Sequence, residues 1–371
     1  MKGFGFGCMR LPLWNSGDQA AVDMDAMRQM VDAFLQAGFT YFDTAYIYHN
    51  GKSEEYLRQA LVERYPRESF QLATKLPIMV IKSREEQERV FAEQLERCGV
   101  TYFDYYLIHG IDANRWGLVQ KLDCFGFLRE KKRQGLARRI GFSYHASPEL
   151  LDEILAAHPE VDFVQLQINY LDWENEGIQS KRCYETVRRH GKPVFVMEPV
   201  KGGTLARLPA EAEQLLRAYH PQRSMASWAM RFAGSHEGVE MVLSGVSSMA
   251  QMQDSISFMR DFEPLNGEER ALIERVVGII NQSIAIPCTA CRYCVDGCPK
   301  GIPIPDYFAL LNAEKQALNR GFSIQKRYYD NYIREFGRAS DCIQCGQCEE
   351  ACPQHIGVMD ALKEVARAFE Q

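Results

Sequence analysis

The amino-acid sequence predicts a (β/α)₈ TIM barrel followed by a small, mostly α-helical domain. Eight short apolar runs recur through the first 281 residues, amphipathic stretches separate most of them, and eight of the 12 cysteines lie after residue 287. The 371 residues suit one large domain and one small domain better than a single average domain. We therefore expect a barrel over residues 1–281 and a C-terminal domain over residues 282–371.

The eight apolar runs are the expected strands of the barrel. In chain order they are Phe4–Met9, Phe39–Asp43, Phe70–Lys75, Asp104–His109, Arg138–Ser143, Phe163–Ile168, Pro193–Met197 and Val239–Leu243. Strands that are apolar throughout are typical of a parallel sheet covered by helices. Eight strand–helix units in about 280 residues match the usual length of such a barrel, about 250 residues.

Segments with helical periodicity lie between most of the expected strands. The apolar residues between Met27 and Leu35 fall on one helix face, and Gly38 follows them as a helix-ending glycine. A doubly wound open sheet is the structural alternative. However, the segment Gly3–Gly7 lies within a strand and opens no helix, so it does not match the usual dinucleotide-binding turn.

Composition narrows the class of protein. A formal net charge of −6 argues against nucleic acid as a partner, because neutralising phosphates needs a basic surface. No run of 18 or more apolar residues predicts a membrane span, and the N-terminus lacks the apolar stretch of a secretory signal. We therefore expect a cytoplasmic protein.

Two cysteine runs near the C-terminus have the spacing of iron–sulfur ligands. They are Cys288-x2-Cys291-x2-Cys294-x3-Cys298-Pro299 and Cys342-x2-Cys345-x2-Cys348-x3-Cys352-Pro353. In two-cluster ferredoxins the first three cysteines of each run bind one cluster and the fourth reaches the other. This predicts two [4Fe–4S] clusters, one held by Cys288, Cys291, Cys294 and Cys352, the other by Cys342, Cys345, Cys348 and Cys298.

Zinc and a redox dithiol are the alternatives to clusters. Zinc sites favour separated cysteine pairs or Cys/His mixtures, and a thioredoxin-type motif uses one CxxC. Residues 299–341 are more than a compact β-type ferredoxin needs between its motifs and include a helical pattern, which favours an α-helical ferredoxin-like domain. We expect the remaining cysteines to be buried apolar side chains: Cys8, Cys98, Cys124 and Cys183.

Polar residues stand at or near the carboxyl ends of successive expected strands, where a (β/α)₈ barrel places its active site. They are Asp43 and Tyr48 after the second strand, Lys75 on the third, His109 on the fourth, Ser143 on the fifth, and Gln165 and Asn169 on and after the sixth.

These residues suit proton donation to a carbonyl group that receives hydride on carbon. A phenol with an ordinary pKa of about 10 is a weak acid at neutral pH. The Lys75 ammonium, held by Asp43, would favour the phenolate of Tyr48, and His109 would orient the carbonyl oxygen. Individually, Tyr48 could be a loop aromatic, Lys75 a solvated charge and His109 a core histidine.

The segments Asp43–Glu54, Thr74-Lys75, Tyr106–His109, Gly141–Ser143 and Val164–Asn169 resemble the aldo/keto reductase family in order and approximate spacing. The resemblance covers about residues 3–262. The whole chain resembles bacterial members that carry a C-terminal 4Fe–4S ferredoxin domain. It implies a catalytic tetrad of Asp43, Tyr48, Lys75 and His109, with Tyr48 as general acid/base and carbonyl reduction or alcohol oxidation as the reaction.

The resemblance also implies a nicotinamide dinucleotide, usually NADP(H), bound without a Rossmann fold. Ser143 and Gln165 would hold its carboxamide, and Ser244, Gly245, Val246, Ser247 and Ser248 would meet its phosphates and ribose. The sequence departs from the family pattern at Met197, where an aromatic usually stacks on the nicotinamide, and at Tyr144, where an Asn is usual. Gln251 replaces an arginine that reads the 2′-phosphate, so the choice between NADP and NAD stays open.

Together the two parts suggest an iron–sulfur oxidoreductase that couples a small carbonyl or alcohol substrate to a one-electron partner, such as a ferredoxin, a flavodoxin or a quinone-linked complex. A hydride carries two electrons, whereas each cluster passes one. Two alternatives remain: an electron carrier whose barrel is a docking scaffold, and an active reductase whose clusters are structural.

Overall fold

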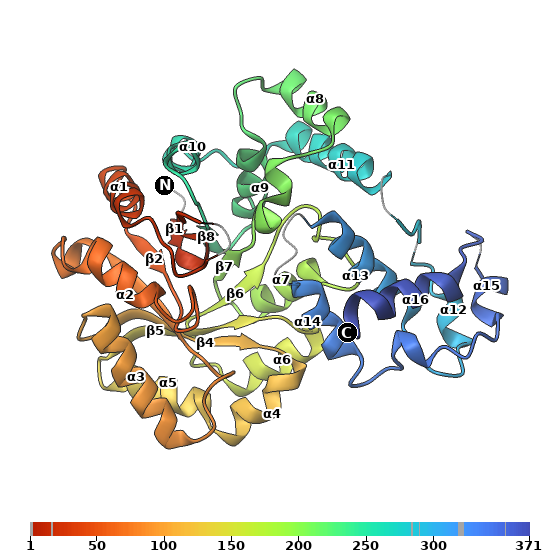
Figure 1. Cartoon of the computed structure of the whole chain (residues 1–371), viewed down its shortest axis with the longest axis horizontal. Coiled ribbons are helices and arrows are strands. Elements are labelled where there is room, and N and C mark those ends of the chain that lie inside the picture. Colours follow the sequence, from red (N-terminus) through yellow and green to blue (C-terminus); the bar gives the residue numbers. More distant parts are fainter. Residues whose placement is uncertain (1–2, 16–17, 283–284, 289, 318–322, 353) are drawn as a thin grey trace.

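The computed structural model describes residues 3–15, 18–282, 285–288, 290–317, 323–352 and 354–371. Eight parallel strands close into a barrel in the order β1 to β8, with helices around it (Figure 1). The closed barrel confirms the predicted fold and excludes an open doubly wound sheet. The strands are β1 Gly3–Gly7, β2 Tyr41–Asp43, β3 Gln71–Leu76, β4 Phe103–Ile111, β5 Ala137–Tyr144, β6 Phe163–Gln167, β7 Val194–Met197 and β8 Val239–Ser244.

The barrel helices lie between and after the strands. They are α1 Met24–Gln36, α2 Ser53–Leu57, α3 Arg84–Cys98, α4 Ala113–Lys121, α5 Cys124–Arg133, α6 Pro148–Ala157, α7 Ser180–Arg189, α8 Ala210–Tyr219, α9 Met225–Gly234, α10 Met249–Met259 and α11 Gly267–Gln282. Short 3₁₀ or π turns are η1 Cys8–Arg10, η2 Arg58–Val62, η3 Arg67–Ser69, η4 Lys201–Ala206 and η5 Ala339–Asp341.

The first strand is shorter than the sequence predicts. The apolar run continues to Met9, but the extended segment ends at Gly7 and Cys8–Arg10 turns as η1. Within β1, a β-carbon on Gly5 would lie 2.5 Å from the Leu243 side chain and 2.8 Å from the Tyr41 ring. Only glycine fits there, because large side chains such as Tyr41 fill the barrel interior.

The C-terminal part forms a separate helical module with its own apolar core. Its helices are α12 Tyr293–Asp296, α13 Ile304–Gln316, α14 Ile324–Tyr332, α15 Gln347–Glu350 and α16 Val358–Phe369. The core includes Tyr307, Leu310, Tyr329 and Val365, joined by Ile178 of the barrel. The sequence pattern predicts helices over residues 307–319 and 358–369. The second is α16, whereas the first, α13, begins earlier, at Ile304, and its expected end at residue 319 lies outside the described residues.

The helical module lies beside the barrel, and α14 lies near the ends of β4 and β6 (Figure 1). The Asn331 side chain donates to the carbonyl oxygen of His145, which follows β5, over 2.7 Å. Gln179, just before α7, donates to the Tyr332 hydroxyl over 3.1 Å. Both contacts involve strand-to-helix loops, so the module lies at the barrel end where the carboxyl ends of the strands meet. The boundary expected between residues 281 and 282 falls at the end of α11 and stays a prediction.

Within the described residues, no helix has the length and apolar character needed to cross a membrane.

Candidate active site and cluster cavities

The four residues of the expected tetrad meet at the mouth of the barrel. Asp43 ends β2, Tyr48 lies in the turn that follows, Lys75 lies in β3 and His109 in β4. Lys75 Nζ donates to Asp43 Oδ1 over 2.6 Å and to the carbonyl oxygen of Thr44 over 2.8 Å. The same ammonium lies 5.0 Å from the centre of the Tyr48 ring. The Tyr48 and His109 rings meet edge to face with centres 5.7 Å apart.

Burial divides these four residues into a supporting pair and an accessible pair. Asp43 and Lys75 are only 4% and 1% exposed, so their charges are removed from water together. Tyr48 and His109 are half-buried as whole residues. The ion pair therefore lies deeper in the barrel than Tyr48 and His109.

The charges at this site hold each group in a definite protonation state. Burial lowers the pKa of the Lys75 ammonium, but the Asp43 carboxylate outweighs burial and the net shift is upward. Burial raises the pKa of the Tyr48 phenol; Lys75 acts in the opposite direction, as expected from sequence, but does not overcome burial. Tyr48 is therefore a protonated hydroxyl at neutral pH.

His109 is a neutral imidazole. Burial lowers its pKa well below the ordinary value, and the positive charges of Lys75, Arg327 and Arg115 add to the effect. Its Nδ1 is buried and has no hydrogen-bond partner among the described residues. A neutral imidazole beside the phenol can hold a carbonyl oxygen by a hydrogen bond without competing as an acid.

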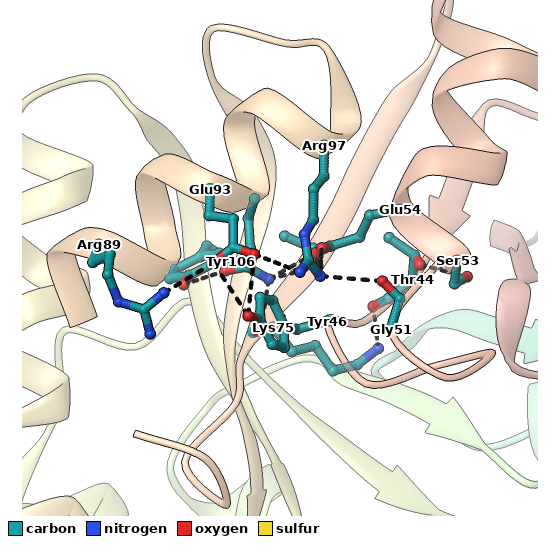
Figure 2. Close-up of polar contacts among 12 residues, drawn as sticks. Thr44, Tyr46, Gly51, Ser53, Glu54, Lys75, Arg89, Glu93, Arg97 and Tyr106 are labelled. Atoms are coloured by element: carbon teal, nitrogen blue, oxygen red, sulfur yellow. Dashed lines mark hydrogen bonds and ion pairs between the residues drawn. The ribbon is translucent and has the colours of Figure 1, made fainter. Parts of the chain in front are cut away.

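A buried carboxyl lies behind the tetrad, on α2. Glu54 is fully buried and accepts hydrogen bonds from Thr74 Oγ1 over 2.7 Å and Gln94 Nε2 over 2.8 Å. Gln94 also donates to the backbone carbonyl of Lys75, so this network fixes the end of β3. Arg97 lies beside Glu54, 3.8 Å from Oε2 (Figure 2). Burial raises the pKa of Glu54 to about 7.

Sequence reasoning placed Glu54 in a family-like segment and gave it no role. Nothing in the alternation of apolar and polar residues marks it as buried, because the flanking residues Ser53 and Glu55 are polar or charged too. Only its hydrogen bonds to Thr74 on β3 and Gln94 on α3 show that this carboxyl supports the segment that carries Lys75.

The residues expected to hold a nicotinamide lie on neighbouring strands. The Ser143 hydroxyl on β5 accepts a hydrogen bond from the backbone N–H of Gly110 over 2.7 Å. Gln165 on β6 is buried, and its Oε1 has no hydrogen-bond partner among the described residues. An amide oxygen without a partner fits a ligand that brings an N–H donor, such as a carboxamide. Met197, at the end of β7, is half-buried.

The expected phosphate-contacting segment joins β8 to α10. Ser244 and Val246 are buried, whereas Gly245 and Ser247 are exposed. The backbone N–H of Ser247 donates to Gln251 Oε1 over 2.8 Å, so the Gln251 side chain folds back on the loop. This geometry stabilises the loop, and the neutral amide supplies no positive charge to a phosphate at that position.

The eight clustered cysteines line two cavities of the helical module. Each cavity draws cysteines from both sequence motifs, in the two sets that the ferredoxin spacing rule groups. One is lined by Cys288, Cys291, Cys294 and Cys352, and the other by Cys298, Cys342, Cys345 and Cys348.

In the part of the chain that the structure describes, no group of three or more His, Cys, Asp or Glu side chains is arranged to hold a single metal ion. Burial raises the pKa of Cys294 and of Cys348 to about 11. Without a metal these thiols stay protonated, so loading a cluster releases protons.

The four cysteines outside the motifs are buried, as the sequence predicts. Burial raises the pKa of each thiol, which keeps it neutral and unreactive among apolar neighbours: Cys8, Cys98, Cys124 and Cys183.

Comparison with known proteins agrees with this division of the chain. The aldo/keto reductase family profile matches residues 4–277, and a 4Fe-4S dicluster domain matches residues 287–356. The chain belongs to the aldo/keto reductase family, and it joins that barrel to a dicluster domain.

Individual relatives cover the barrel. An aldo-keto reductase of Mycolicibacterium vanbaalenii is 27% identical over 270 residues, which is 71% of this chain and 88% of that protein. The holo form of aldo-keto reductase AKR11C1 from Bacillus halodurans has a TM-score of 0.58 and 25% identity, covering 74% of this chain and 91% of its own. An aldo-keto reductase from Klebsiella pneumoniae in complex with NADPH shares the fold, with a TM-score of 0.57, 20% identity and coverage of 74% and 90%.

Proposed function

We propose that this protein is an NAD(P)-dependent oxidoreductase that transfers hydride between a nicotinamide cofactor and a small carbonyl or alcohol substrate, with Tyr48 as the general acid/base. The observation that supports this best is the buried Lys75–Asp43 pair beneath a half-exposed Tyr48 and His109. Membership of the aldo/keto reductase family supports the same chemistry.

In the direction of reduction, the bound nicotinamide supplies hydride to the carbonyl carbon. The Tyr48 hydroxyl donates its proton to the carbonyl oxygen as negative charge develops there. The Lys75 ammonium, kept charged by Asp43, stabilises the resulting phenolate. The neutral His109 imidazole orients the carbonyl oxygen by a hydrogen bond. Ser143 and Gln165 would hold the carboxamide of the cofactor.

The same proposal assigns two [4Fe–4S] clusters to the helical module. Cys288, Cys291, Cys294 and Cys352 would hold one cluster, and Cys342, Cys345, Cys348 and Cys298 the other. Clusters of this kind pass single electrons, so a ferredoxin- or flavodoxin-like protein is the proposed redox partner. We also propose a cytoplasmic location, since a reducing compartment favours free thiols and cluster ligands.

The proton-donor role can be tested with two matched substitutions. Tyr48→Phe removes the hydroxyl at the mouth, and we expect kcat for aldehyde reduction to fall by about 10²- to 10⁴-fold. Tyr46→Phe is the control, because the Tyr46 hydroxyl bonds Glu93 away from Lys75, and it should leave kcat within about threefold of wild type. Full activity of Tyr48→Phe with NADPH or NADH would contradict the assignment.

The role of the clusters needs a separate measurement. After anaerobic purification with iron and sulfide analysis, the protein is titrated with NADPH and then with NADH. Bleaching of the cluster absorbance shows that nicotinamide and clusters exchange electrons. If the absorbance stays constant while aldehyde reduction is intact, the clusters are structural.

A further inference from the structure

Helix α14 of the iron–sulfur module covers the loop that follows His109. Arg327 Nε donates to Asp112 Oδ2 over 2.6 Å, and Arg327 Nη2 donates to the carbonyl oxygen of Gly110. Gly110 has a φ of +69°, and a β-carbon there would lie 2.8 Å from Arg327 Nη2. The guanidinium therefore packs directly against the backbone next to the His109 imidazole, although the two residues lie far apart in sequence.

The ion pairs at the mouth differ in how many cations one carboxylate receives. Three cations each pair with one carboxylate: Lys75 with Asp43, Arg10 with Glu198, and Lys201 with Asp172. Asp112, however, receives two guanidinium groups. Arg115 Nη1 lies 2.5 Å and Arg327 Nε 2.6 Å from the same oxygen, Oδ2. Two cations and one anion leave one positive charge in excess beside His109.

Arg327 also keeps a free donor. Its hydrogen bonds use Nε and Nη2, and among the described residues no acceptor bonds Nη1. The side chain is 15% exposed, so it is held in place yet not sealed. The Arg327 guanidinium is held through Nε and Nη2, while Nη1 can still donate a hydrogen bond. A guanidinium held in this way is suited to bind a carboxylate.

We propose that Arg327 binds an anionic group of the substrate, and that the substrates of this barrel are small carbonyl compounds that also carry a carboxylate. This inference rests on the proposed function of the Tyr48 site and names its substrate class. A monoanionic carboxylate would neutralise the positive charge that Asp112 leaves unpaired. The iron–sulfur module thus supplies a substrate-binding residue to the barrel.

The test compares an aldehyde that carries a carboxylate with one that does not: a carboxybenzaldehyde and its methyl ester, each assayed with the intact holoprotein. In Arg327→Met we expect kcat/KM for the acid to fall by about 10- to 100-fold, mainly through KM, and kcat/KM for the ester to change by less than about threefold. Arg327→Lys should recover part of the loss for the acid, because it restores the charge.

Lys326→Met is the matched control. Lys326 precedes Arg327 on α14 and pairs with the exposed Asp330, so its loss removes the same charge from the same helix without touching the mouth. Both substrates should be reduced as by wild type. A second measurement needs no variant: benzoate should compete with the aldehyde in wild type, and benzamide at the same concentration should not.

Equal losses for acid and ester in Arg327→Met, together with no competition by benzoate, would overturn the inference while the Tyr48 assignment stands. Absence of turnover of either aldehyde by wild type would overturn the proposed function and the inference with it.

Discussion

The burial of Glu54 behind the active site can be tested through the pH dependence of the free energy of unfolding. Its carboxyl is fully buried and accepts two hydrogen bonds on Oε1, while Oε2 lies 3.8 Å from Arg97. Burial raises its pKa from 4.5 to about 7. The substitution Glu54→Gln keeps an oxygen for Thr74 and Gln94 and removes the titrating proton.

The sign and size of the effect follow from that shift. Between the unfolded pKa and the folded pKa, the native protein binds more protons at Glu54 than the unfolded chain, so stability falls as pH rises. The contribution is complete below the unfolded pKa and lost above about pH 7. Between about pH 5.5 and about pH 8 it amounts to about 2 kcal/mol.

The assay is urea unfolding of the barrel at several pH values, followed by tryptophan fluorescence. All four tryptophans lie in the barrel part of the sequence: Trp14, Trp116, Trp173 and Trp228. Buried histidines also titrate in this range, and their effect on stability has the opposite sign. The quantity to compare is therefore the free energy of unfolding of the wild type minus that of Glu54→Gln at the same pH. That difference should fall by about 2 kcal/mol from about pH 5.5 to about pH 8. A difference that stays constant with pH would refute the reasoning.

Three further predictions concern stability and metal content. Arg231 bonds the buried Glu269 at 2.7 and 2.8 Å, so Arg231→Met leaves that carboxylate unpaired and should lower the free energy of unfolding in urea by about 3 to 5 kcal/mol. The control Arg133→Met removes an exposed ion pair and should leave the free energy of unfolding almost unchanged. Gly141→Ala puts a β-carbon 2.5 Å from a carbonyl oxygen of β6, and calorimetry should show a lower Tm, with a loss of about 1 to 3 kcal/mol. Cys298→Ser should reduce the iron content from about eight to about four atoms per chain by iron analysis; unchanged iron would remove this cysteine from the ligand set.

The barrel could be predicted because its strands are marked locally. Each apolar run is short, largely buried and bounded by helical patterns, so all eight expected strands have counterparts in β1 to β8. The polar residues at the strand ends follow from the same placement, since parallel strands bring their carboxyl ends to one rim. This is why Asp43, Lys75 and His109 could be grouped from their positions in the sequence.

Features that depend on packing between distant segments could not be predicted. The proposed role of Arg327 depends on how α14 docks against the β4–α4 loop. Its position in the helical pattern alone indicates an ordinary surface cation. Glu54 is similar, because its burial depends on the contact of α2 with β3. The exchange of Cys298 and Cys352 between motifs was foreseeable only because cluster ligands obey a spacing rule.

The crossing of cysteines between the two cavities has a consequence for biosynthesis. With the proposed ligand sets, the cluster begun by Cys288 cannot be completed until Cys352, in the second motif, has been made. Helix α14 lies in sequence between the two motifs, so its docking is bracketed by both clusters. The barrel strands are all made before the first motif cysteine, whereas both proposed clusters can be complete only after Cys352 has been made, so cluster assembly is the later step in biosynthesis.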